Sequence, residues 1–469
     1  MIGAGEHRGR LGSAGPSVLV AGGRVPGKRE TRLLGTCLPS GGAASNPMRQ
    51  FLPRWFRSAG WRPLAVAGIL PVAAWAAAVG EAVPPRPAGY DPAALPGGAE
   101  FFVLRGGLAA ARARFEAGGP ARVAFLGGSI TAMSGWRERV MADLRRRFPR
   151  TEFDFVAAGI GSLGSVPHAF RFSRDVLARG PVDLLFVEAA VNDATNIPDQ
   201  PARMLRGMEG VVRQARLANP RMGIVHLHFA MPEHLADYRA GRVPEAIRQH
   251  ERVAAAYGHP SLDLAREVTA RIDAGQFSWE KDFRNLHPSP FGHEVYADAI
   301  ARLLDAAWAG SAGPVPPPAA LPPEPLDPAS YFRGRLGNLA TIRAGRGVTL
   351  DPAWRAADGK ATRPGFVGVP ALVASGAGAE LEFEFTGTAA GLFLTAGPDT
   401  ARLEVSVDGG PFAPVDTWTR WSASLHLPWA LMLADGLAEG PHRCRVRLAA
   451  RPVGESGGET LRVFHLLLN

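Results

Sequence analysis

A serine, an asparagine and a histidine stand at positions where their side chains could carry out acyl transfer. Ser129 follows the apolar run 123–126 and the pair Gly127-Gly128, Asn192 closes a second apolar run, and His287 precedes a late helical pattern. A serine hydroxyl can attack a carbonyl carbon, a side-chain amide can donate to the oxyanion that forms, and an imidazole can take the proton. The three residue types therefore predict ester chemistry.

These residues depend on the elements that carry them. From about residue 99 to 308, short apolar runs alternate with helical patterns in steps of roughly thirty residues, which predicts βαβ units around a parallel sheet. Strands are expected at residues 122–126, 152–157, 183–189, 223–229 and 260–263, and helices at 135–147, 169–177, 201–218, 244–257 and 291–308. Open sheets of this kind bind ligands at the carboxyl ends of their strands, where Ser129 and Asn192 are expected.

A second domain is expected after this α/β region. Residues 310–328 are rich in proline and predict a stiff, extended linker. Residues 329–469 show alternating strand patterns broken by turns, with Asp408-Gly409 as a hairpin signal. The pattern predicts an all-β sandwich, jelly-roll-like in kind, behind an α/β domain at residues 99–309.

The net charge of +9 belongs mostly to the N-terminus. Residues 1–62 hold ten Lys and Arg against two Asp and Glu, which leaves +1 for the rest of the chain and argues against a nucleic-acid surface. Met48 is followed by basic residues and a short apolar stretch, so residues 48–82 predict a signal peptide or N-terminal anchor, and residues 1–47 a mis-assigned extension. Cleavage is expected between Ala78 and Val83, giving a secreted or periplasmic protein.

Three blocks of this sequence resemble those of the SGNH/GDSL-type hydrolases. Gly127 to Thr131 resembles the first block, with Gly128 in place of the usual Asp, and Val191-Asn192-Asp193 resembles the amide block. The run from His287 to His293 resembles the closing His-Pro block. The resemblance covers roughly residues 100–308 and implies a flavodoxin-like three-layer α/β/α fold.

The resemblance also implies roles for single residues. Ser129 would be the nucleophile, His287 its general base, and Asn192 an oxyanion donor, joined by the backbone N–H of Gly161 in the second block. Ser162 stays an alternative to Gly161, because the donor is a backbone group. Arg284 stands where the family usually has Asp, so we expect Asp282 to orient His287, with a Ser–His dyad as the alternative.

Other features have simpler interpretations. His226 and His228 lack companions in metal-ligand spacing, so we expect two strand histidines, no metal site and no cofactor. Glu188 and Asp193 flank Asn192 and are expected to fix its loop. Three tryptophans of the second domain could stack on sugar rings or fill a sandwich core: Trp418, Trp421 and Trp429.

The sequence thus predicts a serine esterase that hydrolyses small acyl esters, O-acetyl groups on carbohydrate above all, through an acyl-enzyme. The carbohydrate part is an association, from expected export, the appended sandwich and the lack of a long apolar lid. Two alternatives stay open: an O-acyltransferase to a sugar hydroxyl, and a non-catalytic carbohydrate-binding protein on a decayed hydrolase fold. No membrane partner is expected beyond the N-terminal anchor.

Overall fold

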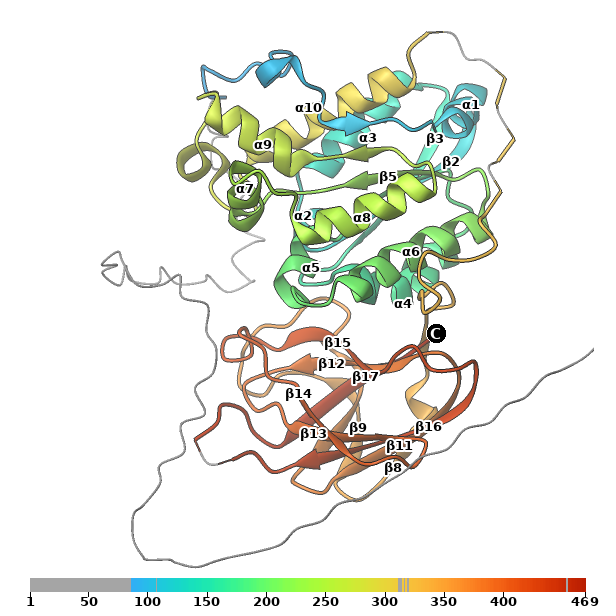
Figure 1. Ribbon diagram of the computed structural model, residues 1–469, viewed down its shortest axis with the longest axis vertical. Coiled ribbons are helices and arrows are strands. Elements are labelled where there is room, and N and C mark those ends of the chain that lie inside the picture. Colours follow the sequence, from blue (N-terminus) through green and yellow to red (C-terminus); the bar gives the residue numbers. More distant parts are fainter. Residues whose placement is uncertain (1–85, 107, 311–313, 316, 319, 453) are drawn as a thin grey trace, which may run out of the picture. The chain divides into compact units, whose positions relative to one another are not determined.

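The structure is a computed structural model that describes residues 86–106, 108–310, 314–315, 317–318, 320–452 and 454–469 (Figure 1). The predicted extension, signal peptide and cleavage site fall outside these residues. No helix among the described residues is long and apolar enough to cross a bilayer.

A six-stranded sheet forms the centre of the α/β region, in the order β1-β6-β5-β4-β2-β3. Neighbours from β6 to β3 are parallel, and β1 pairs with β6 in the antiparallel sense. The strands are β1 (Phe102–Val103), β2 (Gly119–Gly127), β3 (Thr151–Gly159), β4 (Leu184–Glu188), β5 (Gly223–Leu227) and β6 (Ser261–Leu262). The order of β3-β2-β4-β5-β6 is the flavodoxin-like one, which confirms the predicted fold.

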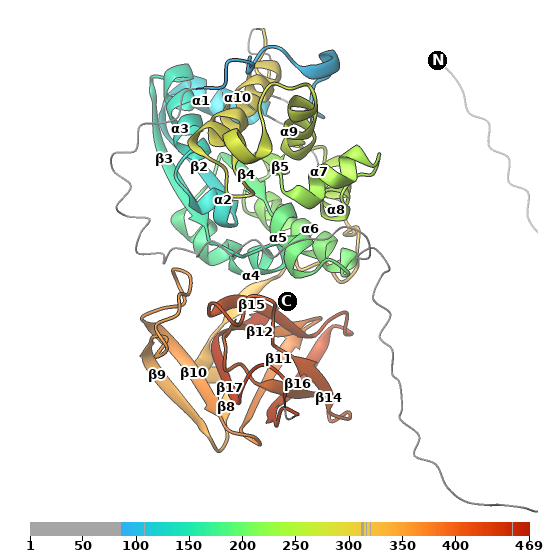
Figure 2. The ribbon, with the colours of Figure 1, turned by 90° about the vertical axis from the view of Figure 1, so that its left-hand side faces the viewer.

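Helices cover both faces of this sheet (Figure 2). They are α1 (Ala109–Ala117), α2 (Ser129–Ala132), α3 (Trp136–Arg147), α4 (Ser165–Asp175), α5 (Ala190–Asn196), α6 (Pro201–Ala218), α7 (Pro232–Arg239), α8 (Glu245–Ala256), α9 (Leu264–Asp273) and α10 (Pro290–Ala307). Successive residues of β2 point to opposite faces: Val123 and Phe125 pack with α1, α3 and α10, whereas Ala124 and Leu126 pack with α4, α6 and α8. The part of β2 that is buried on both faces, residues 123–126, is therefore apolar throughout.

The predicted strands and helices of this region are present, with ends shifted by a few residues at most, and α6 has the predicted bounds. Five of the described helices were not predicted: α1, α2, α5, α7 and α9. The strand expected at residues 183–189 ends at Glu188, so Asn192 lies in the first turn of α5 and not on a strand.

The proline-rich segment packs against α6 along part of its length. The Arg213 guanidinium donates to the carbonyl oxygens of Pro322, at 3.0 Å, and Pro323, at 3.3 Å. The backbone N–H of Leu326 donates to the Glu209 carboxylate at 2.5 Å. The described part of the segment from Pro322 to Leu326 is thus held by side chains of α6.

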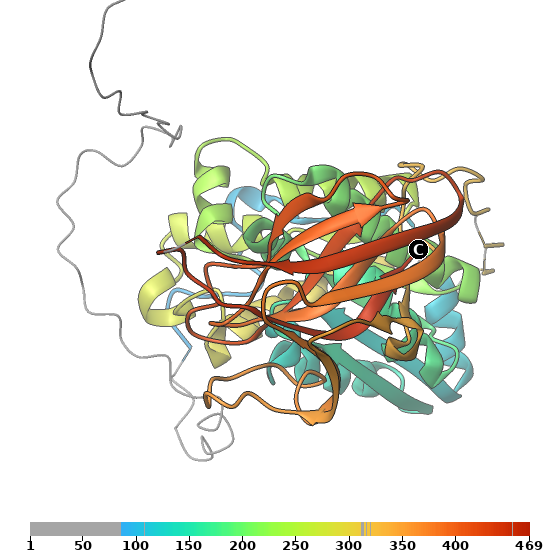
Figure 3. The ribbon, with the colours of Figure 1, turned by 90° about the horizontal axis from the view of Figure 1, so that it is seen from below.

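Two antiparallel sheets make up the second region, which confirms the predicted sandwich (Figure 3). One sheet has the order β15-β12-β17-β10-β9, with β7 beside β17, and the other β14-β13-β16-β11-β8. The strands are β7 (Arg335–Gly337), β8 (Arg343–Ala344), β9 (Val348–Trp354), β10 (Val369–Ser375), β11 (Glu380–Gly387), β12 (Ala390–Ala396), β13 (Arg402–Val407), β14 (Ala413–Asp416), β15 (Leu427–Ala434), β16 (Gly440–Ala449) and β17 (Thr460–Leu468). Asp408 and Gly409, with φ of 52° and 75°, form the predicted hairpin turn between β13 and β14.

The sandwich and the α/β region share hydrophobic core. Phe366 and Phe393 of the sandwich belong to the same cluster of buried side chains as Val166 of α4 and Met208 of α6. Asp435 pairs with Arg203 and Arg206 of α6, at 3.0 and 3.1 Å. Apolar burial, with these ion pairs beside it, stabilises the contact between the two regions.

Several histidines are buried and set how stability should depend on pH. Burial lowers the pKa of His168 and His226 well below the ordinary value, that of His234 to about 4 and that of His259 to about 3. In the unfolded chain these rings take up protons near pH 6.5, so stability should be lost as pH falls from about 6.5 towards 4, by up to about 1.4 kcal/mol per pH unit for each ring. Glu188, with a pKa raised to about 7, opposes this, as do Asp263 and Asp298, whose pKa values burial also raises.

We therefore expect a lower melting temperature at pH 5 than at pH 7, measured by circular dichroism. A His259→Gln variant, which has no titrating group at that position, should lose less stability over the same range. A melting temperature that does not change between pH 7 and 5 would contradict the burial of these rings.

Candidate active site

Ser129 is the first residue of α2, directly behind the end of β2. Its hydroxyl lies 2.8 Å from Nε2 of His287, which comes from the loop before α10. The first N–H groups of a helix have no partner within it, so the backbone N–H of Ser129 is free to face a bound carbonyl oxygen. The nucleophile and base expected from the sequence are therefore brought together in hydrogen-bond geometry.

The two glycines before Ser129 are required by space. A Cβ on Gly128 would lie 2.0 Å from Oδ1 of Asn192, and one on Gly127 would lie 2.3 Å from Oγ1 of Thr131. The usual Asp of the family at position 128 would therefore collide with Asn192 in this structure. Gly128 thus lets the amide come close to the nucleophile turn.

Glu188, at the end of β4, binds the nucleophile turn through Gly128 and Thr131. It accepts the Gly128 backbone N–H at 2.5 Å and the Thr131 hydroxyl at 3.1 Å. Its side chain is fully buried, and burial raises the pKa of this carboxyl to about 7. The residue thus fixes the first block, not the loop around Asn192 that the sequence suggested.

Asp193 fixes the second block. Its carboxylate accepts the backbone N–H of Ser165, the first residue of α4, and pairs with Nε2 of His250, each at 2.9 Å. All three side chains are buried. Asn192 and Asp193 are neighbours in α5, so the same helix presents the amide to Ser129 and ties down the loop before α4.

That loop carries the predicted backbone donor. Gly161 is buried, and Ser162 after it has a φ of 72°, a left-handed conformation that favours glycine. The glycine-like position of the block is therefore Ser162. Its carbonyl accepts Nδ2 of Asn196 at 2.8 Å, which helps to hold the strained turn. Which of the two N–H groups meets an oxyanion stays a prediction.

His287 is held through its backbone, and its ring is open to solvent on one side. The His287 N–H donates to Oδ1 of Asn285 at 2.7 Å, and Ser289 caps α10 just behind it. The protein atoms around the ring lower its pKa by desolvation, and the positive charge of Arg363 lowers the pKa further. A neutral imidazole at neutral pH is the form that can accept the Ser129 proton.

Asp282 makes other contacts. Residues Trp279–Phe283 form a single π-helical turn, and the Asp282 carboxylate accepts the backbone N–H of Ser278 at 2.7 Å and its hydroxyl at 3.0 Å. Among the described residues no hydrogen bond joins Asp282 to His287. The carboxylate closes the start of its own turn, so the described geometry is that of a dyad, and a triad role for Asp282 stays a prediction.

From this geometry we expect Asp282→Asn to keep kcat for a small ester within about threefold, because an amide oxygen can still accept the two Ser278 hydrogen bonds. Steady-state kinetics beside the wild type test this. A loss of about 10⁴-fold with unchanged melting temperature would instead make Asp282 the group that orients His287.

The remaining candidates take ordinary roles. His228 pairs with Glu251 at 2.7 Å, and the His226 ring stacks on His259 with 5.7 Å between centroids. The described residues contain no group of three or more His, Cys, Asp or Glu side chains that could hold a metal ion. Trp421 is exposed, Trp418 is half-buried, and Trp429 is half-buried and packs against the sandwich core.

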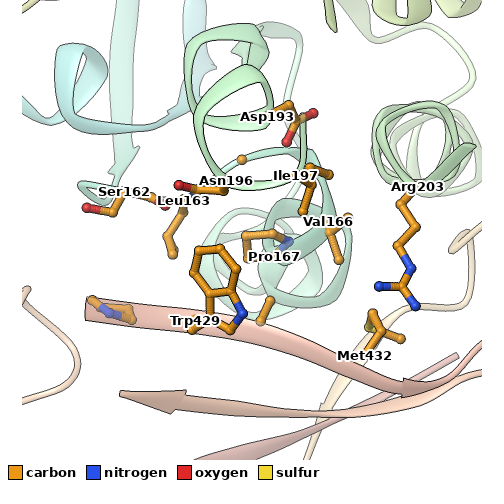
Figure 4. A pocket seen from close by; sticks show the side chains of 13 residues that line it. Ser162, Leu163, Val166, Pro167, Asp193, Asn196, Ile197, Arg203, Trp429 and Met432 are labelled. Carbon is orange, nitrogen blue, oxygen red and sulfur yellow. Dashed lines mark hydrogen bonds between the residues drawn. The ribbon is translucent and has the colours of Figure 1, made fainter. Parts of the chain in front are cut away.

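Trp429 of β15 lines a hollow beside the Ser162 turn (Figure 4). Its indole faces Leu163 and Asn196, and Val166 and Pro167 of α4 continue the wall. The sandwich thus contributes side chains next to the turn that carries the predicted backbone donor.

Sequence reasoning missed Arg363, a residue of the sandwich. Its guanidinium donates to the Ser162 hydroxyl, 201 positions away in the sequence, through Nε and Nη2 at 3.3 Å each. No motif surrounds this arginine, and only the packing of the two regions reveals it.

Comparison with known proteins agrees with this geometry. Residues 125–295 match the sequence model of the GDSL-like lipase/acylhydrolase family. The α/β region is therefore a GDSL-like domain, and the protein is an ester hydrolase. A search of curated protein sequences gave no match.

The chain is also similar to solved structures. The chain is similar to a two-domain esterase active on acetylated mannans, with a TM-score of 0.64 and 21% identity over 78% of this chain and 96% of that one. The same enzyme co-crystallised with mannopentaose has a TM-score of 0.63 and 20% identity, over the same shares of the two chains. A catalytic mutant of an acetylxylan esterase from Geobacillus stearothermophilus has a TM-score of 0.34 and 19% identity, over 42% of this chain and 99% of that one.

Proposed function

We propose that this protein is a serine esterase that removes small acyl groups, O-acetyl groups above all, from carbohydrate through an acyl-enzyme. The observation that carries the proposal is the 2.8 Å hydrogen bond between Ser129 and His287 at the carboxyl edge of the sheet, with Asn192 beside it. A non-catalytic carbohydrate-binding protein would not need these three side chains side by side.

In the first half-reaction the Ser129 oxygen attacks the ester carbonyl carbon while its proton passes to Nε2 of His287. The carbonyl oxygen becomes an oxyanion, and the N–H groups of Ser129 and of the 161–162 turn, with the Asn192 amide, donate to it. The bond to the alcohol oxygen then breaks, and His287 returns the proton to that oxygen. An acyl-Ser129 ester remains.

In the second half-reaction water takes the place of the alcohol. His287 accepts one water proton as the water oxygen attacks the acyl carbon, and the same donors hold the second oxyanion. Collapse releases the carboxylic acid, and the proton returns to Ser129. These steps use side chains and backbone groups of this chain.

The carbohydrate part has separate support. The appended sandwich contributes Trp429 and Arg363 near the site, and the fold is shared over both domains with an esterase whose substrates are acetylated mannans. The His287 ring is reachable from solvent, as a polymer substrate requires.

Acetate release from acetylated mannan and acetylated xylan by purified residues 83–469 tests the proposal. Acetate should appear from at least one polymer, and p-nitrophenyl acetate should be cleaved faster than a long-chain ester. Mass spectrometry of a fluorophosphonate-treated sample should place the label on Ser129. If the acetyl group moves to an added sugar instead of water, the protein is the alternative acyltransferase.

We also propose that the protein is exported, by the signal peptide expected from Met48. N-terminal sequencing of the protein from the culture medium or periplasm should then begin between Val79 and Pro84. An intact Met1 on a cytoplasmic product would overturn this.

A further inference from the structure

Arg363 belongs to the loop 355–368 that joins β9 to β10 of the sandwich, yet its side chain ends at the active site. Besides its two contacts with the Ser162 hydroxyl, its Nε lies 2.9 Å from the place that a Cβ on Gly161 would take. The guanidinium therefore covers both residues of the turn whose N–H groups are the predicted backbone donors.

The base of this loop is firmly held. The Thr362 hydroxyl donates to the carbonyl oxygen of His426 at 2.8 Å, and the His426 N–H donates to that of Ala361 at 2.9 Å. Phe366 is buried and packs edge-on against Phe393, with 4.8 Å between ring centroids. Arg363 thus projects from a packed loop, which limits the entropy lost in holding it at the site.

The charge of Arg363 is not neutralised locally. Among the described residues its hydrogen bonds go only to the Ser162 hydroxyl, and no carboxylate lies within ion-pair distance. By contrast, Arg462 and Arg447 of the same sandwich pair with Asp399 and Glu404, both at 2.5 Å. Partial burial lowers the pKa of Arg363. A partly desolvated cation without a counter-charge is costly, unless negative charge arrives beside it during function.

We propose that Arg363 is a positioning residue of this active site, which fixes the turn at residues 161–162 and supplies positive charge for the oxyanion that forms beside it. The proposal rests on the proposed esterase function. It makes the sandwich a part of the catalytic apparatus.

The same charge acts on His287. In the part of the chain that the structure describes, Arg363 is the one charged group whose field lowers the pKa of that ring, and burial lowers the pKa of its titratable neighbour His293 to about 4. Removing the cation should raise the pKa of His287. Because the base must be neutral to accept a proton, the acidic limb of kcat/KM should then move to higher pH.

The experiment uses the full chain with p-nitrophenyl acetate, a substrate too small to report on sugar binding. Arg363→Gln should lower kcat by about 10- to 100-fold, which is somewhat less than the fall caused by removing a direct oxyanion donor. It should also move the acidic limb of kcat/KM to higher pH. Arg363→Lys should keep the wild-type acidic limb, because it keeps the charge, while kcat falls because the paired contact with Ser162 is lost. Arg355→Gln, at an exposed arginine of the same loop, serves as the matched control and should match the wild type.

A double-mutant cycle with Ser162→Ala tests the route of the effect. If Arg363 acts through the turn, Arg363→Gln should cost less in kcat on the Ser162→Ala background than on the wild type. The proposal would be overturned if Arg363→Gln kept both the wild-type kcat and the wild-type acidic limb of kcat/KM. It would also be overturned if kcat fell together with the melting temperature while the acidic limb stayed at the same pH. Since Ser129→Ala tests the esterase function itself, an active wild type with an inert Ser129→Ala and an unaffected Arg363→Gln would refute only the role of Arg363.

Discussion

Ser129→Ala is expected to lower kcat for ester hydrolysis by about 10⁶-fold, and His287→Ala to do nearly the same. The two side chains act as one unit, since the serine is a weak nucleophile until the imidazole takes its proton. The double variant should therefore be scarcely slower than either single one. Steady-state assays with p-nitrophenyl acetate measure kcat of the two single variants and of the double variant.

Both variants should fold normally, because Ser129 and His287 lie at an open site and carry no core packing. Ser134→Ala, at an exposed serine five residues further on, is the matched control and should keep wild-type kcat. Losses that simply added up in the double variant would show that the two residues act independently, against the proposed mechanism.

Asn192→Ala should lower kcat by about 10²- to 10³-fold and leave KM nearly unchanged, because an oxyanion donor is needed in the transition state far more than in the bound ester. Asn192→Asp should be worse still, since a carboxylate cannot donate to the oxyanion and would repel it. Measuring kcat and KM separately distinguishes this from lost binding. A rise in KM at constant kcat would mean that Asn192 binds substrate and does not stabilise the oxyanion.

The sequence predicted those parts of the site that are encoded locally. Ser129 follows an apolar strand and two glycines, and His287 precedes a helix that begins with Ser289 and Pro290, so both lie at the element ends where the sequence pattern expected them. Asn192 was expected on a strand and lies in α5, but at the same edge of the sheet.

The remainder depends on contacts that no local pattern records. Asp282 was expected at His287 because it is near in sequence, yet a π-helical turn directs its carboxylate to Ser278. Ser162 takes the left-handed conformation although a glycine precedes it. Arg363 reaches the site only because two separate regions of the chain pack together.

The core shared by the sandwich and the α/β region has a consequence for how such an enzyme can change. A change at Phe366 or Phe393 alters the surroundings of α4 and α6, and therefore reaches the loop before α4 that carries Ser162. The α/β region expressed alone would expose the part of this core that the sandwich covers, so we expect it to be less stable than the full chain. An exchange of either half would therefore have to bring side chains that fit the surface around Phe366 and Phe393.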